Sequence, residues 1–285
     1  MKYTSKRKTF TLLRCLSFLL LLALLSGCQS YTEGSRPTEN TSAQSTAATT
    51  DPSIPSSGTP SNKKRVAITF DDGPQCRDVE YGPNTKMIVD ELNKYGFHAT
   101  FFLIGKRIDA SPDDTLPYIV QNGNEIGIHS YNHTNSSDAY YNNCTEEYYQ
   151  KEINQTRDAI LRMVPGYEIK TMRPVGGHIS IERVKASPYS VINWDVDSED
   201  YKYTYSRGDS DEQCAAKVNT IVQNVMSNVR DGSIILLHDI YESTYDATVI
   251  ILQRLYEEGY EVVSVSELLG SKMQPGRLYL DAYSI

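Results

Sequence analysis

The chain from residue 65 runs Arg65-Val66-Ala67-Ile68-Thr69-Phe70-Asp71-Asp72-Gly73-Pro74. An apolar run predicts a strand, and Gly73-Pro74 is a turn signal that stops the strand and exposes two adjacent carboxylates at its C-terminal end. Neighbouring side chains on an extended or turning backbone point in different directions. One carboxylate can therefore bind a metal while the other acts as a base. A purely structural turn is the alternative explanation of this pattern.

Two histidines follow a second apolar run. Glu125-Ile126-Gly127-Ile128 predicts a short buried strand, and His129 and His133 come directly after it. Their spacing predicts that both lie on one face of a helical turn, where both imidazoles can reach one ion. Two His and one Asp form a three-ligand set that leaves positions open for water and substrate, as catalytic zinc sites do. A pair of surface histidines is the alternative.

Three further polar groups stand at predicted strand ends or turns. The run Ser233 to Leu237 predicts a buried parallel strand that delivers His238 at its tip, although a core histidine would give the same pattern. Any carboxylate in the cluster 193–201 could orient and charge-stabilise a catalytic histidine. Arg173 precedes a Gly-rich turn at 176–177, which could present backbone N–H groups.

The order of these motifs resembles the NodB-type polysaccharide deacetylases, carbohydrate esterase family four, from about residue 64 to 270. The resemblance implies that Asp71 is the catalytic base and that Arg173 holds it. It also implies that His238 is the catalytic acid and that Asp200 tunes this acid. The implied fold is α/β, an irregular (β/α)7 barrel similar to a TIM barrel.

By the same resemblance, Asp72, His129 and His133 bind the metal, which is expected to be Zn²⁺, with Co²⁺ or another divalent ion as alternatives. The implied substrate and oxyanion positions are Gly176, Tyr201 and Leu236. Two positions depart from the family pattern. Val175 stands where the family has a second proline, which affects the rigidity of the turn that offers the Gly176 N–H. Tyr201 replaces a usual Trp in one wall of the acetyl pocket.

The N-terminus predicts secretion. Five basic residues precede and flank an apolar run from Leu16 to Leu25, a pattern typical of a signal peptide. Leu25-Ser26-Gly27-Cys28 resembles a bacterial lipobox, so residues 1–27 are expected to be removed and Cys28 lipidated. An ordinary signal peptide is the alternative. Residues 28–62, rich in Ser, Thr and Pro, are expected to form a disordered tether. The predicted location is extracytoplasmic, on the cell membrane and facing the cell wall.

The net charge indicates which class of molecule the protein binds, and the cysteine count limits the disulfides that it can form. Without residues 1–27 the chain has 23 Lys and Arg against 36 Asp and Glu, a formal charge of −13. An acidic protein gains nothing from neutralising phosphates, so nucleic acid is excluded as a partner and a glycan is favoured. A monomer is expected. Cys76, Cys144 and Cys214 are an odd number, which allows at most one intrachain disulfide. The Cys76 thiolate is a further metal-ligand candidate.

Strands and helices are predicted to alternate. Strands are expected near 65–70, 98–104, 125–129, 169–173, 189–194, 233–238 and 260–265. Helices are expected near 84–95, 113–122, 145–164, 179–187, 211–229 and 245–258. Candidate catalytic residues at the ends of several strands favour a barrel over an open sheet. The catalytic domain is placed at 63–270, followed by a C-terminal tail at 271–285.

The expected function is metal-dependent hydrolysis of N-acetyl groups on N-acetylglucosamine units of a cell-wall glycan, with release of acetate and with peptidoglycan as the expected substrate. Three alternatives remain. The first is an esterase acting on acetylxylan or another O-acetylated glycan, because one site can hydrolyse both bonds. The second is a chitin-oligosaccharide deacetylase. The third, a catalytically inactive glycan-binding lipoprotein, is disfavoured by the intact set of acids and histidines.

Overall fold

The computed structural model describes residues 63–75, 84–134 and 140–284. The predicted signal peptide, Cys28, the tether and Cys76 lie outside these residues. Within the described part of the chain, no helix has both the length and the apolar character needed to cross a membrane.

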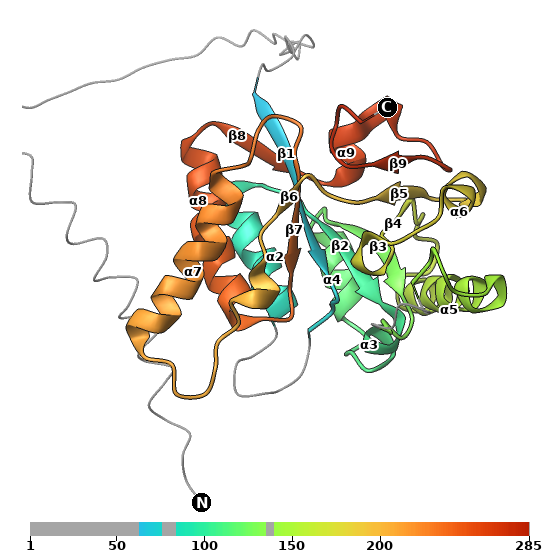
Figure 1. Cartoon of the computed structure of the whole chain (residues 1–285), viewed down its shortest axis with the longest axis horizontal. Helices are drawn as coiled ribbons and strands as arrows, with labels where there is room; N and C mark the ends of the chain where they lie inside the picture. The colour runs from blue at the N-terminus through green and yellow to red at the C-terminus, as the bar shows by residue number, and fades with distance from the viewer. Residues whose placement is uncertain (1–62, 76–83, 135–139, 285) are drawn as a thin grey trace, which may run out of the picture. The chain divides into compact units, whose positions relative to one another are not determined.

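A single sheet organises the domain (Figure 1). The strand order is β6-β7-β1-β2-β3-β4-β5-β9, and β8 also pairs with β1; every ladder between these strands is parallel. The strands are β1 (Lys64–Asp71), β2 (Thr100–Ile104), β3 (Glu125–Ser130), β4 (Thr171–Met172), β5 (Ser190–Ile192), β6 (Val196–Asp197), β7 (Ile234–His238), β8 (Tyr260–Val263) and β9 (Leu278–Tyr279).

Most of the helices pack against the outer face of the sheet, whereas Val265 and Leu269 of the short helix α9 belong to a smaller core on the inner face. The helices are α2 (Asn84–Tyr95), α3 (Gly105–Asp109), α4 (Thr115–Gln121), α5 (Glu146–Met163), α6 (Ile181–Ala186), α7 (Asp211–Met226), α8 (Glu242–Glu257) and α9 (Val265–Leu269), with short 3-10 turns η2 (Val175–Gly177), η3 (Asp200–Lys202) and η4 (Gly270–Lys272). Neighbouring helices contact one another in the order α7, α8, α2, α4 and α5. In Figure 1, α7 and α8 lie on one side of β1 and α5 lies on the other.

Successive side chains of a strand point to opposite faces of the sheet, so the buried residues form two separate hydrophobic cores. In β1, Val66, Ile68 and Phe70 belong to the large core under the helices, whereas Ala67 belongs to a smaller core on the opposite, inner face. Because side chains alternate along a strand, Asp71 shares the inner face with Ala67. All six residues from 66 to 71 are buried, as expected for a parallel strand covered on both faces.

The sheet is an incomplete barrel. Its order ends at β6 and β9, and the chain passes directly from β5 to β6 through residues 193–195. The fully buried side chain of Arg173 contacts the end of β5, because its Nε donates to the Ile192 carbonyl at 3.1 Å and its Nη2 donates to the Asn193 carbonyl at 3.0 Å. Its Nη1 donates to Thr69 and Asp71 of β1, so Arg173 connects the end of β5 to β1.

The prediction of an α/β fold with parallel strands and covering helices is confirmed, and all seven predicted strands are present. Three features differ from the prediction. The short strands β6 and β9 were not predicted, because each has only two residues, too few to show the alternation of apolar and polar side chains that is typical of a strand. The short helices α3 and α9 were also missed. The segment 271–285 is not a separate tail, because β9 pairs with β5 through Val191 and Ile192.

Candidate active site

Three ligand atoms converge at the C-terminal ends of β1 and β3. The Nε2 atoms of His129 and His133 lie 3.4 Å and 3.0 Å from Oδ1 of Asp72. One ligand atom from each of these residues lies within 4.8 Å of the others, which makes them a possible metal-binding group within the described chain. His129 is buried, and the other two side chains are partly buried.

The two histidines are not on a helix, and this part of the prediction is wrong. His129 belongs to β3, which continues to Ser130, and His133 follows in a turn. The chain reverses because His133 adopts a left-handed conformation with φ of 50°, and its N–H donates to Oγ of Ser130 at 3.0 Å. A tight turn thus brings the two imidazoles together, with ring centroids 5.1 Å apart.

The donor set fits a divalent cation. Nδ1 of His129 lies 2.8 Å from the Arg173 carbonyl, an acceptor, so Nδ1 carries the proton and Nε2 offers a lone pair. Oδ1 of Asp72 is buried and has no hydrogen-bond partner of its own. Burial would raise the pKa of Asp72, but the two adjacent imidazoles hold it well below its usual value, so Asp72 is a carboxylate. One carboxylate and two imidazole nitrogens are typical ligands of a catalytic zinc ion.

Arg173 holds one carboxylate oxygen of Asp71. Its Oδ1 accepts a 2.7 Å hydrogen bond from Nη1 of Arg173, and the same nitrogen donates to Oγ1 of Thr69 at 2.7 Å. The guanidinium also lies over the ring of Phe102, 4.3 Å from its centroid. Oδ2 of Asp71 remains directed toward the ligand group, 3.8 Å from Nε2 of His129. The ion pair therefore fixes one oxygen and leaves the second available as a base.

His238 has a carboxylate partner. Its Nδ1 lies 2.7 Å from Oδ1 of Asp200, and its backbone N–H donates to Oδ2 of Asp200 at 2.7 Å. Thr244 donates a third hydrogen bond to this fully buried carboxylate. Burial would lower the pKa of His238, but the hydrogen bond and charge of Asp200, with the charges of Asp71 and Asp72, raise it to about 9. The ring is only partly buried, and its Nε2 lies opposite the nitrogen that contacts Asp200, so it can carry a proton.

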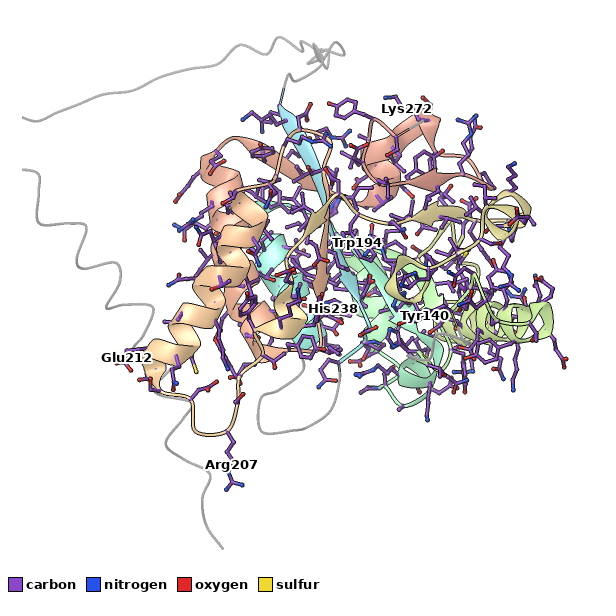
Figure 2. All side chains as sticks on the ribbon, in the orientation of Figure 1. Tyr140, Trp194, Arg207, Glu212, His238 and Lys272 are labelled. Carbon is purple, nitrogen blue, oxygen red and sulfur yellow. The ribbon has the colours of Figure 1, made fainter. Side chains whose placement is uncertain are left out.

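Register places the acid and the base side by side. Asp71 pairs with His238 in the β1–β7 ladder, and His129 comes from β3, on the other side of β2. Along the edge of the sheet, Asp71 therefore lies between His238 and the two histidines of the ligand group. In Figure 2, His238 lies at the same end of the sheet as this edge, with Trp194 above it.

The predicted substrate residues Gly176, Leu236 and Tyr201 belong to η2, β7 and η3. Gly176 has φ of 60°, in the left-handed region, and the turn around it is fixed by a 2.9 Å bond from the Gly177 N–H to the Pro174 carbonyl, although Val175 replaces a proline. Leu236 is buried and shares the inner face with His238. Tyr201 is 46% exposed, with its ring edge-on to His238 at 5.9 Å between centroids.

Several residues that hold the active-site side chains in place were not predicted from the sequence. Thr69 and the Asn193 carbonyl hold Arg173, and Thr244 holds Asp200. Asp239 is fully buried beneath the Asp72–Gly73 turn and accepts a 2.5 Å hydrogen bond from Thr85. Burial raises the pKa of Asp239 to about 7. Only Asp239 carried a signal, as an acid next to His238; hydroxyl groups and carbonyls have no recognisable spacing.

Several known proteins are similar to this chain in sequence. The family model described as polysaccharide deacetylase matches residues 58–188. The peptidoglycan-N-acetylmuramic acid deacetylase PdaC of Bacillus subtilis is 37% identical over 213 residues, which cover 75% of this chain and 40% of PdaC. A peptidoglycan-N-acetylglucosamine deacetylase of Bacillus cereus is 33% identical over 185 residues, which cover 63% of this chain and 75% of that relative. The chain thus spans less than half the length of PdaC.

Solved structures share the fold. A family 4 acetyl xylan esterase from Clostridium thermocellum, in complex with a cobalt ion, is 28% identical with a TM-score of 0.63 and covers 78% of this chain and 100% of that chain.

Proposed function

Because this chain belongs to the polysaccharide deacetylase family, we propose that it is a metal-dependent hydrolase that removes N-acetyl groups from a cell-wall glycan and releases acetate. The expected substrate is the N-acetylglucosamine of peptidoglycan. The observation that carries this proposal is that a carboxylate held by an arginine and a histidine held by a carboxylate lie together beside the three candidate metal ligands. Asp71 is fixed by Arg173, and His238 is fixed by Asp200, on adjacent strands.

Each group suits one proton transfer. Oδ2 of Asp71 accepts a proton from the attacking water, while the bond from Arg173 to Oδ1 keeps the carboxylate oriented. His238 is protonated at neutral pH because its pKa is about 9, so it can donate a proton to the departing amine. An amine leaves poorly without a proton, and a charged imidazole therefore favours amide substrates.

The ligand group would hold the metal. Asp72, His129 and His133 would bind Zn²⁺, Co²⁺ or another divalent ion, and such an ion supplies Lewis-acid polarisation of the acetyl carbonyl and of water. The Gly176 N–H is the proposed backbone donor to the oxyanion. Leu236 and the edge of Tyr201 would line the acetyl pocket.

Acetate release tests this proposal. The purified protein is offered peptidoglycan, chitooligosaccharide and acetylxylan in parallel, before and after treatment with a chelator and again after addition of Zn²⁺ or Co²⁺. We expect release from peptidoglycan that stops on chelation and returns with metal. Release from acetylxylan alone would favour the esterase alternative, and unchanged release after exhaustive chelation would exclude a metal-dependent hydrolase.

A second amino sugar is also a candidate. PdaC carries N-acetylmuramic acid in its name, and the Bacillus cereus relative carries N-acetylglucosamine. The free amines of the product are labelled with fluorodinitrobenzene before acid hydrolysis, because the acid itself removes the remaining N-acetyl groups. Chromatography then separates labelled glucosamine from labelled muramic acid and identifies the sugar that the enzyme deacetylated. We expect free amines on glucosamine units.

We further propose that the enzyme acts outside the cytoplasm as a lipoprotein. The lipobox around Cys28 and the Ser- and Thr-rich segment 29–62 support this proposal. A lipidated Cys28 with two or more acyl chains would anchor the protein stably, and the tether would let the catalytic domain reach the wall.

A further inference from the structure

The two candidate histidine ligands differ in how the fold supports them. His129 lies within β3, and the Arg173 carbonyl orients its ring. His133 lies beyond the strand in a left-handed conformation that is unusual for a residue with a side chain. Its position therefore depends on the peptide units of Tyr131 and Asn132, which connect it to β3.

A buried carboxylate holds these peptide units. Glu152 of α5 is 1% exposed, and its Oε2 accepts the backbone N–H groups of Tyr131 at 2.9 Å and Asn132 at 2.8 Å. Its Oε1 accepts a third bond, from Nδ2 of Asn132 at 2.8 Å. One side chain thus holds two consecutive peptide units just before His133.

The charge of Glu152 is balanced by these donors. Within the described residues, no Lys, Arg or His forms an ion pair with Glu152, so N–H groups alone compensate the buried carboxylate. Hydrogen bonds to an ionised acceptor are about twice as strong as those between neutral groups. A buried carboxylate with only such partners is costly unless the donors stay in place, so it resists movement of the turn.

Close packing secures the other side of the turn. The Tyr131 carbonyl accepts the Lys106 N–H at 3.0 Å, so this residue is held from both sides. Gly105 allows this approach, because a Cβ there would lie 2.4 Å from the Tyr131 ring and 2.9 Å from Oγ1 of Thr156, one helical turn after Glu152. The helix, the turn and α3 therefore form one rigid support.

We propose that Glu152 is a positioning residue that fixes the turn at Tyr131 and Asn132 and so holds His133 ready to bind a divalent cation. This inference rests on the proposed metal-dependent function. Glu152 does not touch the metal or the substrate; it acts through the backbone that carries a ligand.

The test measures metal affinity in the full chain. Zn²⁺ affinity is measured by competition with a chromophoric chelator, and the Co²⁺ absorption spectrum reports ligand geometry. Glu152→Gln preserves the shape of the side chain and removes its charge; Glu152→Ala removes the support. Glu147→Gln is the matched control, because Glu147 is exposed on the same helix. Thermal unfolding of each metal-free protein shows whether it is folded.

We expect Glu152→Gln to weaken Zn²⁺ binding by about 10-fold and Glu152→Ala by about 100-fold, the range typical of groups that orient metal ligands. Glu147→Gln should bind like the wild type. If Glu152 acts through His133, then Glu152→Gln should weaken binding little further in a His133→Ala background. A purely structural role would lower the unfolding temperature and leave the affinity of the folded protein unchanged.

Two results would overturn the inference: wild-type affinity in folded Glu152→Gln, or full additivity with His133→Ala. If Glu152→Ala does not fold, Glu152→Gln decides. Failure of the wild type itself to bind Zn²⁺ or Co²⁺ would instead defeat the proposed metal-dependent function, and this inference with it.

Discussion

His238 and Asp71 face each other across paired strands but are held by opposite charges. A cation fixes the oxygen of Asp71, whereas an anion fixes the nitrogen of His238. Asp200 stabilises the charged form of His238, so this acid keeps its proton at neutral pH.

Replacement of His238 by Asn should separate an acid from a structural histidine. Loss of a general acid should slow amide hydrolysis by about 10²–10⁴-fold, because an unprotonated amine leaves badly. The loss should be far smaller on an aryl acetate, whose phenolate leaves unaided. Turnover of both substrates by one preparation measures this. Equal slowing of amide and ester by a folded variant would mean that another group supplies the proton.

The pH profile should depend on Asp200. The folded pKa of His238, about 9, lies above its ordinary value of 6.5, so the acid form persists through neutral pH and is lost as pH rises through 9. Activity should fall on this alkaline limb. Asp200→Asn removes the main group that raises the pKa and leaves the effect of burial, so the limb should move to lower pH. An unmoved limb would assign it to another group.

Replacement of Asp71 and replacement of Asp72 should have different effects on metal binding and turnover. Asp71→Asn should retain metal and lose turnover, since Asp71 is paired with Arg173. Asp72→Asn should lose metal, because it removes an anionic ligand from a set of three. Metal content of the purified variants, measured by elemental analysis, checks this. Equal loss of metal in both variants would show that the base is misassigned.

At the scale of elements, the inner face of β3 leaves no room at Gly127. A Cβ there would lie 2.6 Å from the Phe102 ring and 2.8 Å from Oγ1 of Thr171. Phe102 in turn packs against the guanidinium of Arg173, so displacement of this ring reaches the residue that holds Asp71. Glycine at this position therefore connects strand packing to the active site.

Gly127→Ala should lower stability by about 1–3 kcal/mol, the usual cost of overpacking a core. It should also lower kcat, because a displaced Phe102 ring would disturb the guanidinium of Arg173 that packs on it. Denaturant unfolding and acetate release measure the two effects. Ile126→Val, on the outer face of the same strand, is the control and should lower stability without a comparable loss of kcat. Normal activity in Gly127→Ala would disprove the proposed connection.

The strands and helices that could be predicted from the sequence are those long enough to show a regular spacing of apolar residues. Runs such as Ile234 to Leu237 are long enough to indicate a buried strand, and polar residues directly after such runs indicate the edge where parallel strands end. The turn between His129 and His133 could not be predicted, because i and i+4 spacing suits a helix as well as a strand followed by a reversal. Glu152 was hidden for a different reason: its partners are backbone N–H groups, which every residue has.

At the scale of the whole molecule, catalysis and anchoring are expected to be separable. Cys28→Ala should release the protein from the membrane fraction while the rate of acetate release stays unchanged, because residues 63–284 contain the whole proposed site. Cys15→Ala, within the predicted signal, is the control and should leave the protein in the membrane fraction. Fractionation followed by an activity assay measures both. Unchanged membrane association of Cys28→Ala would replace the lipid anchor with another means of attachment.

The central place of β1 has a consequence for the time course of folding. Its hydrogen-bonded partners include β7, and the bond from Thr69 to the Ile235 carbonyl joins residues 166 positions apart. During synthesis, β1 is made before the other strands, and its partner β7 is made only after β2 to β6. Contacts so distant in sequence make folding slow. A chain interrupted before residue 238 would carry the base and all three metal ligands, yet it would lack both the acid and the ladder that keeps Asp71 in place. Enzyme activity should therefore appear late and all at once, only after β7 has been made and has paired with β1.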